Sequence, residues 1–458
     1  MSDTRSPLPP ATEMTAQVTE GRFKRVLGTP SLVLFGLVYM VPLTVFTTYG
    51  IVTSLTGGRL VDSYLITLVV MLFTARSYAR MSTAMPYAGS AYVYTQQSLG
   101  GATGFLVGWV LLLDYLFLPM INYLVVGLYM NEYFPAIPNW VWILVSIAIV
   151  TVLNIVGIVS VARTNFVIIA VQAVFVVLFV GFGISTATGN DVDLLAPFVG
   201  DGSEAAGQTG VLFNGAAILA LSFLGFDSVS TLAEEAKDAR RTVPRAIMSV
   251  TLGAGLIFIL LAYVSQLVFP SNEFDNVDTA STQVIAAAGD WLAVLFVAGY
   301  SAGALGSALT SQASVSRILF AMGRDGVLPR PVFGRLSKRF GTPVTAISIV
   351  SVVSLLAIVI DLATLSNMIS FGALFAFSFV NLSVLVHFYI RKGERSGWAW
   401  LNNLVLPVVG VGLTIWLWTS LSPQTFVLGL SWLGVGVVLL LIITRFFTRP
   451  TPTLDLEE

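Results

Sequence analysis

GLVYMVPLTVFTTYG (residues 36–50) and LSFLGFDSVST (residues 221–231) are two apolar stretches with a helix breaker at the centre of each. Pro42 removes a backbone donor and clashes with the preceding turn, and Gly225 lowers helix stability. Both stretches lie within longer apolar blocks that are long enough to cross a bilayer. Interrupted helices at matching places in two halves of a chain indicate a transporter that is built from inverted repeats.

The composition identifies a membrane protein. Of the 458 residues, 56% are hydrophobic and only 10% are charged, whereas a soluble domain carries about 25% charged residues. This excludes a water-soluble protein, and the apolar blocks predict an all-α polytopic membrane protein with twelve transmembrane helices. The expected spans are residues 31–56, 61–82, 103–131, 140–158, 165–186, 210–232, 245–269, 284–317, 343–361, 366–390, 403–420 and 426–447.

Several classes of function are disfavoured by what the chain contains. A net charge of −1 excludes a nucleic-acid binder built on a basic field. The chain has no cysteine and one histidine, His387, which argues against disulfides, metal sites and most catalytic sets. We therefore expect neither an enzyme nor a protein with a cofactor or a bound metal.

The basic residues predict the topology. With the N-terminus inside, all but Arg59 of the 23 lysines and arginines fall in cytosolic segments, as expected for a cell-membrane protein with both termini in the cytoplasm. Spans 1 and 6 carry the two breaks, so each repeat holds five spans, and this odd number makes the second repeat inverted. The expected parts are a disordered cytosolic tail (1–29), two repeats (30–186 and 210–390), two further helices (391–447) and a short tail (448–458).

Two acidic residues lie inside expected spans. Asp114 is near the middle of span 3, and Asp227 follows the break at Gly225. An ionised acid in hydrocarbon costs at least about 2.5–3.5 kcal/mol, so such acids usually face a cavity on an ion or substrate path. The alternative for each is a structural hydrogen bond between helices. The Lys and Arg residues that fall within the expected spans, such as Arg76 and Arg80, lie toward the cytosolic ends, so none is placed at mid-membrane to neutralise these acids, which favours a cationic ligand.

The breaks predict further site residues. Free carbonyls around Met40, Val41 and Ser222 can coordinate a cation, and aromatic rings such as Phe223 can cover an ammonium group, although such rings more often serve packing. Glu234 and Glu235 approach the cytosolic end of span 6, where they form either a gate or a solvated helix end. The polar and aromatic segment MPYAGSAYVYTQQSLGG (85–101), between spans 2 and 3, could form a short surface helix.

Long motifs carry a resemblance to a known family. MPYAGSAYVYTQQSLG (85–100), SFLGFDSVSTLAEEAKDARRTVPRAI (222–247) and ASVSRILFAMGRDGVLP (313–329) resemble signatures of the amino acid–polyamine–organocation superfamily. LLDYLFLPMIN (112–122) and FGALFAFSFVNLSVLVHFYIRKG (371–393) look like the bacterial putrescine importer subgroup. The resemblance covers nearly the whole chain.

The resemblance implies a five-plus-five inverted-repeat core with unwound spans 1 and 6, and import of amines or amino acids linked to protons or to the membrane potential. The superfamily's acid of span 6 falls on Asp227, the candidate for proton coupling, and the subgroup's acid of span 3 falls on Asp114. The subgroup can carry an acid where this chain has Thr47, so diamine selectivity is open. The expected substrate-binding residues are Met40, Val41, Pro42, Thr47, Asp114, Ser222, Phe223, Gly225 and Asp227.

We therefore predict a secondary transporter that imports a small cationic amine, with putrescine as the first candidate. The alternatives are an amino-acid permease of the same fold and a potassium transporter or channel. The expected partners are the amine or amino acid, a proton and the lipid bilayer.

Overall fold

The computed structural model describes residues 27–86, 90–157, 161–189, 193–200, 202, 207–324, 328–337, 339–448 and 451. The expected tail at 1–29 lies outside the described residues except for 27–29. The expected tail at 448–458 lies outside them except for 448 and 451.

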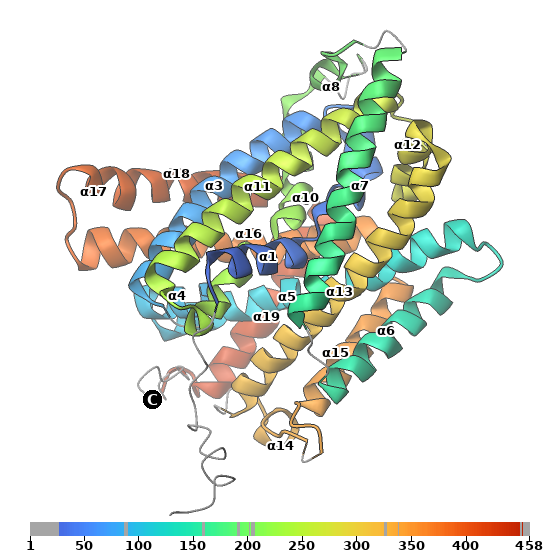
Figure 1. The fold of residues 1–458 in the computed structure, drawn as a ribbon. Helices are drawn as coiled ribbons and strands as arrows, with labels where there is room; N and C mark the ends of the chain where they lie inside the picture. The colour runs from blue at the N-terminus through green and yellow to red at the C-terminus, as the bar shows by residue number, and fades with distance from the viewer. Residues whose placement is uncertain are drawn as a thin grey trace, which may run out of the picture.

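The described residues are almost entirely helical (Figure 1). The elements are α1 (Thr29–Met40), η1 (Pro42–Phe46), α2 (Tyr49–Leu55), α3 (Leu60–Ala84), α4 (Ser90–Leu99), α5 (Gly101–Tyr133), α6 (Asn139–Val156), α7 (Val161–Gly189), α8 (Ala196–Val199), α10 (Thr209–Leu219), η2 (Ala220–Phe223), η3 (Ser228–Glu235), α11 (Ala239–Val268), η4 (Val277–Thr279), α12 (Ala280–Ala288), α13 (Asp290–Arg324), α14 (Arg330–Phe333), α15 (Val344–Ser354), η5 (Leu355–Ile358), α16 (Leu362–Val384), η6 (Leu385–Arg391), α17 (Trp398–Trp400), η7 (Leu401–Val405), α18 (Leu406–Thr419) and α19 (Pro423–Ile443).

Eleven helices within the described residues are long and apolar enough to cross a membrane. They match eleven of the twelve expected spans. The ninth expected span, 343–361, is an apolar helix over Val344–Ile358 that falls short of that length and ends in the 3₁₀ turn η5. The fold is thus the expected helical membrane bundle, while the count of twelve full spans is not confirmed.

The central helix of the bundle is α5. It packs against α13, α16, α6 and α19, and 78% of its most apolar stretch is buried, against 17% for the peripheral α19. Figure 1 shows the short α1 in the middle of the molecule, between α11 and α7, with α6 and α15 on one side and α17 and α18 on the other. Most side chains of α5 therefore face protein rather than lipid.

The short helix α4 is a correction to the sequence-based expectation of a surface helix. The helix forms, but Tyr94 is fully buried and Gln96 is 6% exposed, because α4 packs against α5 and α16. Gly104 permits the close approach, since a Cβ there would lie 2.6 Å from the Cβ of Gln96. The segment thus belongs to the packed bundle.

The two ends of the bundle differ in charge. We call the end that holds Leu27, Arg80 and Arg391 the basic end, because Arg80 and Lys392 lie over the same Phe388 ring there and Arg391 contacts α4 beside them. The opposite end holds acids such as Glu132, Asp278 and Asp361, and we call it the acidic end.

Candidate functional site

The first helix break lies at Val41 and Pro42. Helix α1 ends at Met40, Val41 has φ +52°, and the chain continues as the 3₁₀ turn η1 before α2. The Thr44 hydroxyl lies 2.5 Å from the Met40 carbonyl oxygen and 2.6 Å from that of Val41, and can donate to either. These two carbonyls, expected to be free for a cation, therefore have a partner within the chain.

The second break lies between η2 and η3. Gly225 has φ +131°, a conformation that side chains with a Cβ rarely adopt. Its backbone N–H donates to Oδ1 of Asp227 over 3.1 Å, and its carbonyl accepts from the Ser228 hydroxyl over 2.8 Å. The polar groups that the break frees are thus satisfied by residues of the same turn.

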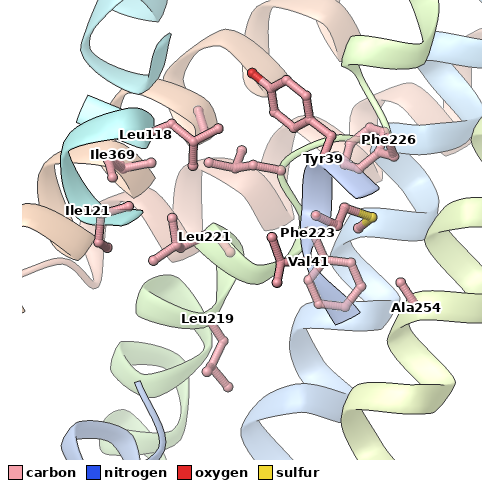
Figure 2. Close-up of a cluster of buried hydrophobic side chains, with 14 of the residues drawn as sticks. Tyr39, Val41, Leu118, Ile121, Leu219, Leu221, Phe223, Phe226, Ala254 and Ile369 are labelled. Carbon is pink, nitrogen blue, oxygen red and sulfur yellow. The ribbon is translucent and has the colours of Figure 1, made fainter. Parts of the chain in front are cut away.

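The two breaks touch each other. A Cβ at Gly225 would lie 2.7 Å from Cγ of Met40 and 3.1 Å from the Gly36 carbonyl oxygen. Only glycine lets the backbones of η2–η3 and α1 approach this closely. Figure 2 shows Tyr39 and Val41 of the first break beside Phe223 and Phe226 of the second.

Both acids that were expected in the site are buried near one another. Asp114 and Asp227 are each 2% exposed, and their carboxylates are close enough for their charges to repel. Oδ1 of Asp114 has no hydrogen-bond partner among the described residues. Gly372 on α16 covers Asp114, since a Cβ there would lie 3.2 Å from the Asp114 backbone nitrogen. None of the ion pairs within the described part of the chain involves either acid.

Three tyrosines surround this acid pair. Tyr39, Tyr78 and Tyr115 are buried, and all three lie within electrostatic range of Asp227. The Tyr39 hydroxyl has no hydrogen-bond partner among the residues that the structure describes, whereas the hydroxyls of Tyr78 and Tyr115 lie near that of Ser90. Two carboxyl groups and these phenolic oxygens offer several acceptors to a cation.

A small cavity lies next to the acid pair. The space open to the centre of a water molecule is about 20 Å³, which is room for a water molecule and not for a diamine. The lining residues come from the first break, α5, the second break and α13: Tyr39, Met40, Val41, Thr44, Thr47, Leu118, Ile121, Asn122, Val125, Leu221, Leu224, Tyr300 and Ser307. Figure 2 shows Leu118 and Ile121 of α5 on the side of Leu221 of the second break, with Val41 of the first break opposite them.

Of the expected site residues, Met40, Val41 and Thr47 line the cavity, and Thr47 forms a hydrogen bond with the Tyr300 hydroxyl. Asp114, Asp227, Pro42 and Gly225 do not line it. Tyr39 is the residue that reaches both places, because it lines the cavity and lies within electrostatic range of Asp114 and Asp227.

Ser222 and Phe223 do not line the cavity either. The Ser222 hydroxyl forms a 3.1 Å hydrogen bond with Tyr64, and the Phe223 ring packs edge-on against Phe258 at 5.4 Å. Both side chains thus fix the second break against α3 and α11.

Polar residues on α5 and α13 complete the cavity, and the sequence analysis missed them. Asn122 donates to the Ser307 hydroxyl over 3.2 Å, and Ser307 donates to the Tyr39 carbonyl over 3.2 Å. Asn122 had a detectable signal, since it is a polar residue in an apolar span about two helical turns after Asp114. Tyr300 and Ser307 had none, because their helix is rich in small polar residues throughout.

Clusters of aromatic rings pack on both sides of the two breaks. Toward the acidic end, the Phe46 ring packs edge-on against Phe179 and Phe296 at 5.5 and 5.1 Å. Toward the basic end, the Tyr78 ring packs edge-on against Phe226 and Phe377 at 5.5 and 5.8 Å. Aromatic clusters thus lie toward both ends of the bundle, and both acids are buried.

The basic end is closed by a backbone contact beside Glu235. Leu27 donates its N–H to the Glu235 carbonyl over 2.9 Å, and Lys237 donates to the Leu27 carbonyl over 2.9 Å. This short bridge ties the start of α1 to the end of η3. Glu235 thus takes part through its backbone, and the side chain of Glu234 lies outside the described part of the structure.

Comparisons with known proteins agree with this architecture. The amino acid permease family profile matches residues 31–430. The chain is 37% identical to the low-affinity putrescine importer PlaP of Escherichia coli K12, over 96% of this chain and 98% of PlaP. It is 26% identical to the branched-chain amino acid permease BcaP of Bacillus subtilis over 93% and 94% of the two chains, and 28% identical to the chloroplastic cationic amino acid transporter 7 of Arabidopsis thaliana over 90% and 74%. The chain belongs to the amino acid permease family.

Proposed function

We propose that this protein is a secondary transporter that imports a small cationic amine, with putrescine as the first candidate. The observation that carries the proposal is the acid pair, Asp114 and Asp227, buried without an ion-pair partner among the described residues and placed where the two helix breaks meet. Two carboxyl groups in such a place favour a ligand that brings positive charge. The likeness to PlaP, which is a putrescine importer, supports the same substrate class.

The substrate path has two successive binding positions, the cavity and the acid pair. The cavity offers uncharged polar groups such as Thr47 and Asn122, and the acid pair lies beside it, beyond Tyr39. A diamine enters the cavity, Tyr39 moves aside, and one ammonium group then binds Asp114 while Asp227 and the carbonyls of the breaks hold the other. Met40, Val41, Pro42, Ser222, Phe223 and Gly225 shape this path.

The conformation in which both acids are buried is one state of an alternating-access cycle. Residues 30–186 and 210–390 form the two inverted repeats, 391–447 form the additional helices, and the basic end with both termini faces the cytosol. The cavity is too small for a diamine, so the elements around it must separate for the substrate to enter. The backbone bridge between Leu27 and Glu235, beside Glu234, is the contact to open on the cytosolic side.

The membrane potential can drive this import. It is worth about 2.3 kcal/mol per charge per 100 mV, so a dication gains about 4.6 kcal/mol. Since each 1.4 kcal/mol is tenfold, accumulation can reach about a thousandfold. A proton carried in on Asp227 can add to this force.

Amino-acid transport is the second candidate, supported by the family match and by BcaP. An amino acid needs amides at a break to bind its carboxylate. The Gly225 amide is already bonded to Asp227, which favours a ligand without a carboxylate.

Uptake into proteoliposomes by the purified protein tests the proposal. With an inside-negative voltage, labelled putrescine should enter with saturation, and excess unlabelled amines should compete better than leucine or arginine. Stronger competition by amino acids would favour the permease alternative, and flux that never saturates would favour a channel.

A further inference from the structure

A cluster of basic side chains lies at the basic end, in the connection between the helices that span 362–391 and 398–419. The first of these helices ends in the wide turns of η6, and the second begins with α17 and the wide turns of η7. Such π-helical turns are often found at functional sites. We call residues 389–400 the connecting loop. In Figure 1, α17 and its connection project away from the bundle on the left.

The one acid of the connecting loop is already neutralised. Glu394 forms a 3.0 Å ion pair with Arg80 of α3, and Asn403 donates to the same carboxylate oxygen over 3.3 Å. The Arg80 guanidinium also lies 4.4 Å from the centre of the Phe388 ring. These contacts fix the loop to α3 and leave no net negative charge at Glu394.

Three basic residues of the loop have no such acid. Arg391, Lys392 and Arg395 are exposed, and none of them forms an ion pair among the residues that the structure describes. Arg391 donates to the Gln97 carbonyl over 2.7 Å, and Arg395 donates to the Tyr389 carbonyl over 3.2 Å. Lys392 lies over the Phe388 ring at 5.1 Å. Carbonyls and rings hold these groups in place without cancelling their charge.

Large apolar side chains are exposed beside this charge. Trp398, Trp400 and Ile390 are 79%, 51% and 56% exposed. Tryptophans at the start of a membrane span lie at the depth of the lipid headgroups. A ligand that fits here carries a negative headgroup for the three cations and an acyl chain for the tryptophans, and a soluble anion would leave those apolar side chains uncovered.

We propose that the connecting loop binds an anionic phospholipid of the adjacent leaflet, with its phosphate on Arg391, Lys392 and Arg395 and an acyl chain along Trp398. Basic pockets between helices at the cytosolic face recognise acidic headgroups in this way. The bound lipid holds the loop against α3 and α4, to which it is already tied through Arg80 and Gln97. This proposal does not depend on the transported substrate.

The experiment measures the melting temperature of the full-length protein in a neutral detergent with added lipid. Phosphatidylglycerol should raise the melting temperature, while phosphatidylcholine and inorganic phosphate should not. The triple variant Arg391→Gln/Lys392→Gln/Arg395→Gln should lose more than half of the phosphatidylglycerol shift. The matched control, Arg330→Gln/Arg335→Gln/Arg339→Gln, removes three exposed charges from another loop of the same end and should keep the shift.

An equal loss in the control, an equal shift with phosphatidylcholine or with phosphate, or no shift in the wild type would each overturn the proposal. A second measurement serves if the triple variant does not fold. Phosphatidylglycerol with brominated acyl chains should quench part of the tryptophan fluorescence of the wild type more strongly than brominated phosphatidylcholine does. Trp398→Phe should remove that difference, and an unchanged difference would place the lipid elsewhere.

Discussion

The Gly225 backbone N–H donates to the Asp227 carboxylate over 3.1 Å, so the acid that follows the second helix break also stabilises it. The same glycine lies against Met40 of the first break. Asp227 therefore has two roles that can be separated: its carboxylate oxygen accepts the hydrogen bond from Gly225, and its ionisable carboxyl group forms part of the acid pair.

Replacement of Asp227 by Asn separates these properties. The amide oxygen of Asn can still accept from Gly225, so the melting temperature should stay near that of the wild type, while the charge and its titration are lost. Uptake should fall and become independent of pH. An uptake rate that keeps its wild-type pH profile would show that a different group couples transport to protons.

Gly225→Ala should unfold the second break. At φ +131° an alanine is strained by about 1–3 kcal/mol, and its Cβ would also meet Met40 Cγ at 2.7 Å. The melting temperature and uptake should both fall. Gly253→Ala is the matched control, since a Cβ there meets nothing within 4 Å and a helix interior gains about 0.5–1 kcal/mol from the change. Equal stability of the two variants would contradict the strained geometry.

Tyr39→Phe tests whether the substrate passes from the cavity to the acid pair by way of Tyr39. The Tyr39 hydroxyl is buried without a hydrogen-bond partner among the described residues, so its loss should not lower the melting temperature. Tyr39 lines the cavity and lies within electrostatic range of both acids, so removal of its hydroxyl should raise the KM for the amine several-fold. Tyr64→Phe, which removes a hydroxyl bonded to Ser222 outside the cavity lining, is the comparison. A larger change in KM for Tyr64→Phe would place the path elsewhere.

The sequence was sufficient to predict the breaks at Pro42 and Gly225 and the interior position of Asp114 and Asp227, because helix breakers and charges in apolar blocks are local signals. It did not separate the acid pair from the cavity, since that depends on how Tyr39 and Leu118 pack between α1 and α5. The burial of α4 was missed for a similar reason. Its composition is polar, and its position is decided by close contacts such as that at Gly104.

Asp361 should give a measurable dependence of stability on pH. It caps α16 and accepts from the Thr364 amide and hydroxyl over 2.8 and 2.7 Å. Partial burial opposes ionisation, but these hydrogen bonds outweigh it and lower the pKa of Asp361, while burial and the Asp361 charge raise the pKa of the neighbouring Asp278. A lowered pKa means that the stabilisation is present above about pH 4 and is lost as the pH falls through the folded-state pKa.

Asp361→Ala should therefore cost about 1 kcal/mol at pH 7, and the difference from the wild type should narrow below pH 4. Asp361→Asn keeps a capping oxygen without the charge and should be nearly as stable as the wild type at pH 7. Melting curves from pH 7 to pH 3 measure both effects. A difference between wild type and Asp361→Ala that grows on acidification would contradict the cap.

The central claim is that Asp114 supplies charge for a cationic substrate and does not serve folding. The most direct measurement is voltage-driven uptake of labelled putrescine by proteoliposomes that contain wild type or Asp114→Asn, with melting temperatures taken on the same preparations. We predict saturable uptake by the wild type, enhanced by an inside-negative potential, and none by Asp114→Asn at an unchanged melting temperature. Wild-type uptake by Asp114→Asn, or no saturable uptake by the wild type, would contradict the account.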